Sequence, residues 1–100
     1  MAIELVFHPA IPDDLAPALA YYDEISKTLG NRFRDNVKDL LFEISERPES
    51  FPIDVEPIRF GRVERFPYLI LFVSRASYVF VIAILHGASD PRKWRERSDQ

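Results

Sequence analysis

Five side chains in the second half of the chain could act together on a phosphate group: Arg59, Arg62, Arg65, Tyr68 and His86. Cleavage of a phosphodiester requires a base for the attacking hydroxyl, an acid for the leaving oxygen and cations for the developing charge. Arginine, tyrosine and histidine can fill these roles. The candidates for catalysis are therefore Arg59, Arg62, Arg65 and His86. No spacing rule ties them together, so the cluster equally fits a site that binds a target without cleaving it.

A second basic segment, Arg92-Lys93-Trp94-Arg95, lies near the C-terminus. An aromatic side chain among cations can stack on a base or insert into a partner, and it can also fold back to anchor the chain end. The predicted target-binding residues are Arg59, Arg62, Arg65, Tyr68, His86, Arg92 and Trp94. Two plainer interpretations stay open. The arginines also fit solvated side chains on strand faces and in a frayed tail, and His86 also fits a hydrogen-bonded structural residue.

Several classes of site do not fit the composition. The chain contains no cysteine, and His8 and His86 are too far apart for a metal-binding helix motif, so we predict neither a metal nor a cofactor. The glycines are too widely spaced for a phosphate-binding loop, and no G-x-S-x-G nucleophile motif occurs. No apolar run approaches the ~18–20 residues of a membrane span, and the N-terminus does not resemble a signal peptide. We expect a cytoplasmic protein with no membrane contact.

Charge is divided unevenly along the sequence, although the net charge is only −3. Residues 1–56 contain five basic and twelve acidic residues, a balance of −7, whereas residues 57–97 contain eight basic and three acidic residues, a balance of +5. Such a split is more informative than the total. It suggests that the C-terminal half meets an anionic partner.

The arginines and His86 are positioned by a predicted antiparallel meander. Two apolar runs rich in β-branched and aromatic residues, Tyr68–Val73 and Tyr78–Leu85, predict strands joined by a hairpin loop at Ser74–Ser77. A third strand is expected near Pro57–Phe60, followed by a turn or bulge at Gly61. The arginines therefore lie on the entry strand of the meander and His86 at its exit.

The first part of the chain predicts one strand and a helix. Ala2–Phe7 alternates as a strand does. With Asp14 as N-cap, Pro17 falls at the third helical position, where its missing N–H would have had no intrahelical partner. The first helix is then expected to run to about Leu29, with Gly30 just beyond its end.

Asn31 is predicted to cap a second helix, which ends at Arg47-Pro48. Its apolar residues have helical spacing and should face the sheet: Phe33, Val37, Leu40, Leu41 and Ile44. The short turn favours an antiparallel helix hairpin. Residues 49–57 contain two more prolines and are expected to form a stiff, extended connection.

The expected fold is α+β, with element order β-α-α-β-β-β and a helix hairpin packed on one face of a mainly antiparallel sheet. Residues 1–100 are expected to form a single domain, with about 92–100 as a polar, partly flexible tail. The two central runs are apolar on both faces, and the tail looks too short and too polar to cover the second one. This predicts an exposed apolar face that binds a protein partner or another copy as a homodimer.

The order of three motifs resembles the RelE/ParE superfamily of toxin–antitoxin toxins, on the ParE or plasmid-stabilisation side. These motifs are Arg65-Phe66-Pro67-Tyr68, His86-Gly87 and Asp90-Pro91 followed by Trp94, and the resemblance extends from Ile3 to Trp94. It implies the same β-α-α-β-β-β fold, inhibition of growth and a cognate antitoxin as partner. ParE-like members are associated with DNA gyrase, and RelE-like members with mRNA cleavage on the ribosome.

The resemblance leaves three functions open. Leu69 and Ser89 stand where family members often carry a basic residue, and no lysine lies between Lys38 and Lys93. These departures favour a ParE-like toxin that acts by binding its target over a nuclease. The alternatives are a RelE-like ribosome-dependent endoribonuclease and a degenerate member that has lost toxicity.

Overall fold

The computed structural model describes residues 2–90 and 92–99. Its elements follow one another in this order: β1 (Glu4–Phe7), α1 (Ile11–Ile25), α2 (Lys27–Glu46), the 3-10 turn η1 (Pro48–Ser50), β2 (Ile53–Val55), β3 (Ile58–Arg62), β4 (Tyr68–Ser74), β5 (Tyr78–His86), α3 (Arg92–Arg95) and the 3-10 turn η2 (Glu96–Asp99). Within the described residues, no helix has the length and apolar content needed to cross a bilayer.

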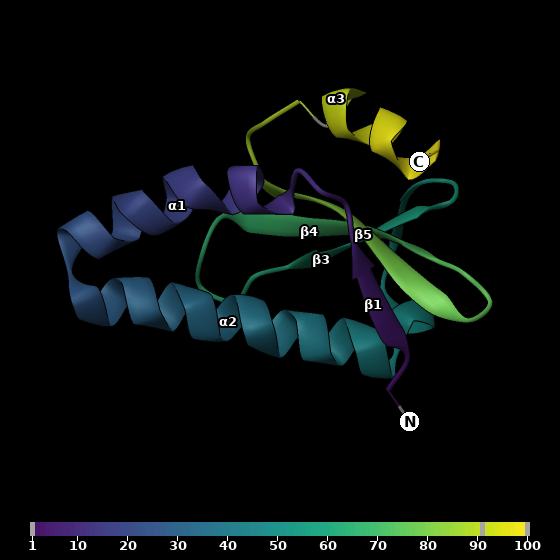
Figure 1. Cartoon of the computed structure of the whole chain (residues 1–100), viewed down its shortest axis with the longest axis horizontal. Helices are drawn as coiled ribbons and strands as arrows, with labels where there is room; N and C mark the ends of the chain where they lie inside the picture. Colours follow the sequence, from purple (N-terminus) through teal and green to yellow (C-terminus); the bar gives the residue numbers. More distant parts are fainter. Residues whose placement is uncertain (1, 91, 100) are drawn as a thin grey trace.

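The strands form one sheet in the order β1-β5-β4-β3-β2. β1 runs parallel to β5, and the other neighbours are antiparallel. The helices α1 and α2 form a hairpin that packs on one face of this sheet, and α3 lies above β5 at the top of the view (Figure 1). The predicted α+β class, with a helix hairpin on a mainly antiparallel sheet, is confirmed.

The junction between the two helices lies four residues earlier than predicted. Ser26 ends α1 and caps α2, because its hydroxyl accepts a hydrogen bond from the backbone N–H of Leu29. Gly30, expected beyond a helix end, is inside α2. A Cβ at Gly30 would lie 1.8 Å from a carboxylate oxygen of Asp23, so the glycine makes room for the ion pair between Asp23 and Arg34.

The start of α1 was also predicted wrongly. The helix begins at Ile11 after Ala10, and Pro17 lies inside it, so Asp14 is not the N-cap. The Asp14 side chain instead reaches the sheet, where it accepts a hydrogen bond from the backbone N–H of Ile84 at 3.1 Å. An interior proline removes one intrahelical hydrogen bond and crowds the carbonyl four residues earlier, so Pro17 is a local cost within α1.

The first face of the sheet packs against the hairpin. Four of the five predicted core residues of α2 are buried, Phe33, Val37, Leu40 and Ile44, while Leu41 is half-buried. They meet the sheet residues Ile70, Phe72, Val79, Val81 and Ile84. The helical period in the sequence thus identified the face of α2 that is removed from water.

The second face of the sheet is covered, contrary to our expectation. Ile58, Leu71, Val73, Phe80, Ile82, Ala83 and Leu85 form a second buried cluster, against which Trp94 of α3 packs. Arg97 donates a hydrogen bond to the carbonyl of Ile82, and Arg75 donates one to the carbonyl of Ser98. The C-terminal segment 92–99 is therefore the cover that seemed to be missing. The argument for self-association through an exposed apolar face no longer holds.

A register shift in β5 explains how this strand serves both clusters. Leu71 pairs with Ala83, but the next residue, Phe72, pairs with Val81, so Ile82 is an extra residue. Ile82 and Ala83 both belong to the second cluster, whereas Val81 and Ile84 on either side belong to the first. This is the behaviour of a β-bulge, which places two consecutive side chains on one side.

Two details of the entry to the sheet differ from the prediction. The proline-rich connection contains an edge strand, β2, paired with β3. Gly61 is not in a turn but in the middle of β3, opposite Ile70. A Cβ there would lie 2.9 Å from Leu40 and 3.0 Å from Phe51, so this glycine lets the helix and η1 approach the strand closely.

Candidate functional site

The end of the sheet where β3 stops, β4 begins and β5 stops brings several predicted site residues together. Arg62 pairs with Leu69, and Leu69 pairs with Leu85. Tyr68, the residue before Leu69, pairs with His86, the residue after Leu85. Directly paired residues share a face of the sheet, and neighbours alternate. Arg62 is thus on the face of the second cluster, whereas Tyr68 and His86 are on the face of the hairpin.

Tyr68 and His86 form an aromatic pair at this end. Their ring centroids are 5.3 Å apart, and the Tyr68 ring also packs edge-on against Phe33, with a centroid distance of 5.3 Å. Burial, followed by repulsion from Tyr21, raises the pKa of the Tyr68 phenol above its ordinary value of 10.0. The phenol is therefore protonated at neutral pH and can donate a hydrogen bond, but it is a poor general base.

His86 is the exposed last residue of β5, and its carbonyl accepts a hydrogen bond from the N–H of Ser89 in the turn that follows. Its Nδ1 accepts a hydrogen bond from the backbone N–H of Ala88 at 3.0 Å. In the neutral ring the proton is then on Nε2, which makes the outward nitrogen a hydrogen-bond donor. The turn is held to the start of β4 by a hydrogen bond from the N–H of Gly87 to the carbonyl of Pro67, at 2.7 Å.

Arg65 is presented on the turn between β3 and β4. Its φ angle is +68°, in the left-handed region. Val63 and Phe66 on either side are buried in the first cluster, so the turn is anchored and the Arg65 side chain is exposed. Asn36 of α2 adds a hydrogen bond to the carbonyl of Glu64 at 2.8 Å. The turn thus presents one exposed cation between β3 and β4.

Arg62 is exposed at the rim of a cavity of about 160 Å³. The floor is apolar and comes from three neighbouring strands, and the complete lining is Asp54, Phe60, Arg62, Leu69, Leu71, Leu85, Gly87 and Ser89. Among the residues that the structure describes, Arg62 has no ion pair and no side-chain hydrogen bond. Sequence reasoning identified Arg62 but missed the apolar lining, which only the strand register places beside it.

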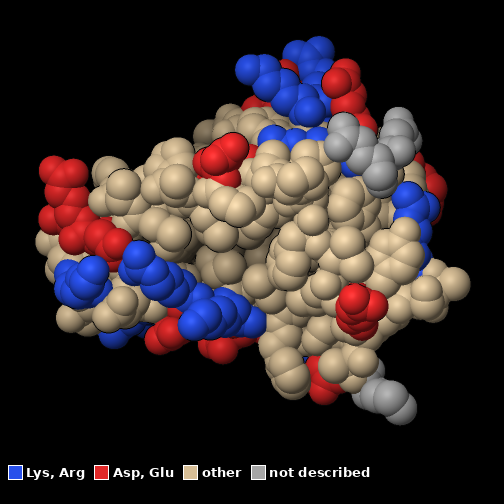
Figure 2. All heavy atoms as spheres, viewed as in Figure 1, with Lys and Arg blue, Asp and Glu red and all other residues tan. Residues whose placement is uncertain are grey.

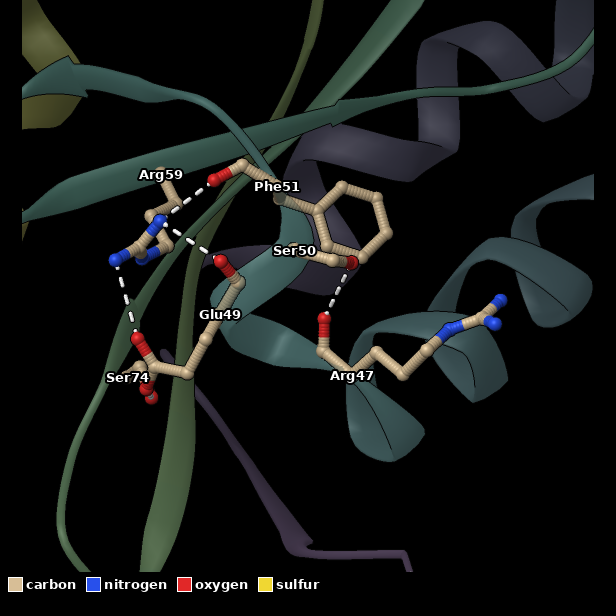
Figure 3. A network of polar contacts seen from close by, with 6 residues as sticks. All are labelled: Arg47, Glu49, Ser50, Phe51, Arg59 and Ser74. Atoms are coloured by element: carbon tan, nitrogen blue, oxygen red, sulfur yellow. Dashed lines mark hydrogen bonds and ion pairs between the residues drawn. The ribbon is translucent and has the colours of Figure 1, made fainter.

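Arg59 is not part of this site. Its side chain is about 20% exposed, and it donates hydrogen bonds to the carbonyl of Phe51 at 2.6 Å and to a Glu49 carboxylate oxygen at 3.1 Å (Figure 3). Glu49 also accepts a hydrogen bond from Ser74 at 2.8 Å. Arg59 and Arg62 lie on opposite faces of β3, since their positions differ by three and successive side chains of a strand alternate. The Arg59 network ties η1 to the sheet.

Arg92 and Trp94 take separate positions on α3. Arg92 is paired with Asp90 at 2.7 Å and is about 81% exposed, and this partner holds the pKa of Asp90 below its ordinary value of 3.8. Trp94 is half-buried and packs on the second cluster, so it anchors the C-terminal segment. Figure 2 shows Lys and Arg side chains gathered over α3, with another row along α2 where both signs of charge mix.

The arrangement is better suited to binding than to acid–base catalysis. Tyr68 and His86 both offer donors, and Arg62 and Arg65 offer cations, whereas no carboxylate among the described residues is hydrogen-bonded to any of the four. No group of three or more His, Asp or Glu side chains in residues 2–90 and 92–99 could hold a metal ion. A larger open depression lies on α2 and includes none of the predicted site residues. It is lined by Asp39, Phe42, Glu43, Glu46 and Arg47.

Comparison with known proteins identifies the fold. No protein-family model matches this chain, and no curated protein matches it. Among solved structures, it is similar to a chain of the chromosomal ParDE toxin–antitoxin system from P. aeruginosa, with a TM-score of 0.72 and 15% identity over 85% of this chain and 96% of that chain. It is also similar to a double arginine-to-alanine mutant of the E. coli toxin RelE in the free state, with a TM-score of 0.63 and 20% identity over 97% and 98%. The resemblance to the RelE/ParE superfamily is thereby confirmed at the level of the fold.

Proposed function

We propose that this chain is the toxin of a type II toxin–antitoxin module, acting in the cytoplasm and neutralised by a cognate antitoxin. The observation that carries the proposal is the RelE/ParE fold, shared over nearly the whole chain with a ParDE system and with the toxin RelE. Residues 1–100 would constitute the toxin domain. The order of Arg65-Phe66-Pro67-Tyr68, His86-Gly87 and Trp94 supports the same proposal.

The proposed mode of action is ParE-like inhibition by binding, with DNA gyrase as the first target to test. The support is chemical. The Tyr68 phenol has a raised pKa, His86 presents a donor, and Arg62 and Arg65 are the exposed cations. A ribonuclease would need a base for the attacking hydroxyl. The site offers donors and cations, which are the requirements of recognition.

A RelE-like ribosome-dependent endoribonuclease is the second candidate. One observation favours it: Arg62, Tyr68 and His86 come from three strands and lie at the same end of the sheet, with Arg62 on the opposite face from the two rings. Because the Nε2 of His86 is exposed, a bound RNA could reach it. A degenerate member without toxicity is the third possibility, because Leu69 lies in the register row of Arg62 where a further cation would strengthen a phosphate site.

Three measurements distinguish these functions. Induced expression in bacteria should slow growth, and co-expression of the protein encoded by the neighbouring reading frame should restore it. In purified form, the protein should inhibit supercoiling by gyrase and leave mRNA intact in a translation extract. Cleaved mRNA would favour the second candidate, and the absence of any effect on growth, supercoiling or mRNA would favour the third. The variant Arg62→Ala serves as the site control, since this exposed side chain has no ion pair among the described residues.

A further inference from the structure

The C-terminal segment leaves part of the second sheet face open beside Arg62. Trp94 packs on the second cluster. The Arg95 guanidinium donates two hydrogen bonds of 3.0 Å to the carboxylate of Asp54 on β2. The cavity of about 160 Å³ has no lining residue from α3. The cavity therefore opens onto this apolar layer beside the C-terminal segment.

The dimensions of the cavity match one side chain. An apolar protein cavity of ~150 Å³ accepts a benzene molecule, whereas sites for drug-sized ligands have volumes of roughly 300–1,000 Å³. The floor consists of Leu69, Leu71 and Leu85 with Phe60 beside them. Leu71 and Leu85 are nearly inaccessible to water, so the floor is fixed by the core beneath it. A phenylalanine or leucine side chain fits this space in size and polarity.

Among the residues that line the cavity, the unpaired charge is positive, although Arg62 also borders a smaller depression lined by Asp39, Glu43 and Glu64. Of the two charged lining residues, Asp54 is already paired with Arg95, whereas Arg62 has no ion-pair partner among the described residues. Arg65, three residues further along, is also exposed and, within the same part of the chain, without an ion pair. A ligand that places an apolar group in the cavity would therefore be favoured by carboxylates next to that group.

This combination fits a peptide better than a nucleic acid. Binding of a phosphate backbone depends on several cations along its path, usually with aromatic platforms for the bases. Here a single cation borders an apolar floor, and the Asp54 carboxylate lies at the same rim. A desolvated pocket that receives one large side chain, with an arginine at its edge, is the usual form of a protein-binding hot spot.

We infer that the cavity beside Arg62 is a docking pocket for one phenylalanine or leucine side chain of an acidic peptide segment. Arg62 would pair with a carboxylate adjacent to the inserted residue, and Leu69 and Leu85 would surround the inserted side chain. The inference deepens the proposed function by giving the chemistry of a partner at this site. It can be tested on the purified protein whether or not the protein inhibits growth.

The test uses N-acetyl-Glu-Phe-Glu-amide as the probe, titrated into the isotope-labelled protein and followed by NMR. We expect a dissociation constant of the order of millimolar, with shifts in the Leu69 and Leu85 methyl signals and in the Gly87 amide. The same peptide with alanine in place of phenylalanine should give no saturable shifts. Arg62→Glu should weaken binding at least tenfold. Arg32→Glu, the same charge change at an exposed site on α2, should change it less than twofold.

Two results would overturn the inference. One is binding of the phenylalanine and alanine peptides with equal affinity, or no shift with either. The other is saturable binding of a twelve-nucleotide uridine RNA that moves the same methyl signals and competes with the peptide. A second variant, Ser89→Phe, should fill the pocket from its rim and abolish peptide binding while the remaining spectrum stays folded. Loss of peptide binding with growth inhibition retained would separate this pocket from the proposed toxic function.

Discussion

Asp14 and Arg97 are paired across 83 positions of the sequence, at 2.8 Å between a guanidinium nitrogen and a carboxylate oxygen. Their side chains are only 10% and 20% exposed. The same carboxylate accepts the N–H of Ile84, and the same guanidinium donates to the carbonyl of Ile82. Because β1 ends opposite Val81, these bonds occupy the edge of β5 that β1 leaves free. One ion pair therefore joins α1, β5 and the C-terminal segment.

Removal of this pair should loosen the C-terminal cover. We expect Arg97→Ala to cost about 2–4 kcal/mol in the free energy of unfolding, because it leaves Asp14 nearly buried without its cation. It should also increase binding of a hydrophobic dye, since the second cluster loses part of its cover. Chemical denaturation and dye fluorescence measure the two effects.

A matched pair of variants identifies the cause. Asp14→Asn with Arg97→Gln keeps polar groups at both positions without charge, and should recover part of the loss in a double-mutant cycle. Arg92→Ala, on the same segment but with an exposed ion pair, should change the free energy of unfolding by less than about 1 kcal/mol. Equal losses for Arg92→Ala and Arg97→Ala would contradict the assignment.

Leu40 should be among the most sensitive positions of α2. It is 7% exposed and lies over Gly61, close enough that a Cβ there would approach it to 2.9 Å. Leu40→Ala should cost about 2–5 kcal/mol, because it removes buried methyl groups and leaves a cavity. Phe42→Ala, on the outer side of the same helix and 63% exposed, should stay within about 0.5 kcal/mol. Denaturant titration of both variants would reveal a wrong helix register if the order were reversed.

The pair between Asp23 and Arg34 should make stability depend on pH in the acidic range. Two hydrogen bonds of 2.7 Å from Arg34 hold the pKa of Asp23 below its ordinary value of 3.8. A group with a lowered folded pKa stabilises the fold above its unfolded pKa, and this contribution is lost as the pH falls through the folded pKa. The stability difference between wild type and Arg34→Gln should therefore be constant near pH 6 and shrink below about pH 4.

An NMR titration of the Asp23 carboxyl tests the origin of this effect. In Arg34→Gln the pKa of Asp23 should return towards 3.8, because the hydrogen bonds from the guanidinium are its largest perturbation. The Asp90 carboxyl, which has Arg92 as its own partner, provides an internal control and should not move. A stability difference that persists unchanged to pH 2 would show that Arg34 acts through packing.

The sequence predicted features that depend on local pattern. Strands β4 and β5 follow from short apolar runs rich in β-branched and aromatic residues, and the buried face of α2 follows from helical periodicity; both are local properties of the chain. The junction at Ser26 was missed because Gly30 looks like a helix terminator, whereas its actual role is to leave space for Asp23 and Arg34. No local signal distinguishes these two uses of a glycine.

Features that depend on pairing across the chain were not predictable in this way. The cover of the second face was missed because Arg95 and Arg97 look like solvated charges in a tail. Their partners, Asp54 and Asp14, lie 41 and 83 positions away. The candidate site shows the same division, since the type of residue identified Arg62, Tyr68 and His86, while only the strand register shows that Arg62 lies on the opposite face from the two rings.

Arg65 allows the contribution of a side chain to function to be separated from that of its backbone. Its φ of +68° is unfavourable for any residue with a Cβ, so Arg65→Ala retains the same strain and should change the free energy of unfolding by less than about 0.5 kcal/mol. Arg65→Gly removes the strain and should be neutral or stabilising by up to about 1 kcal/mol. If the exposed guanidinium contacts the target, both variants should relieve growth inhibition to the same extent.

Arg59→Ala should instead lower the melting temperature, because it breaks the hydrogen bonds to Phe51 and Glu49. Growth assays and thermal unfolding of the three variants show whether each side chain acts in growth inhibition or in stability. An Arg65→Ala protein that is fully stable and still toxic would exclude Arg65 from the site.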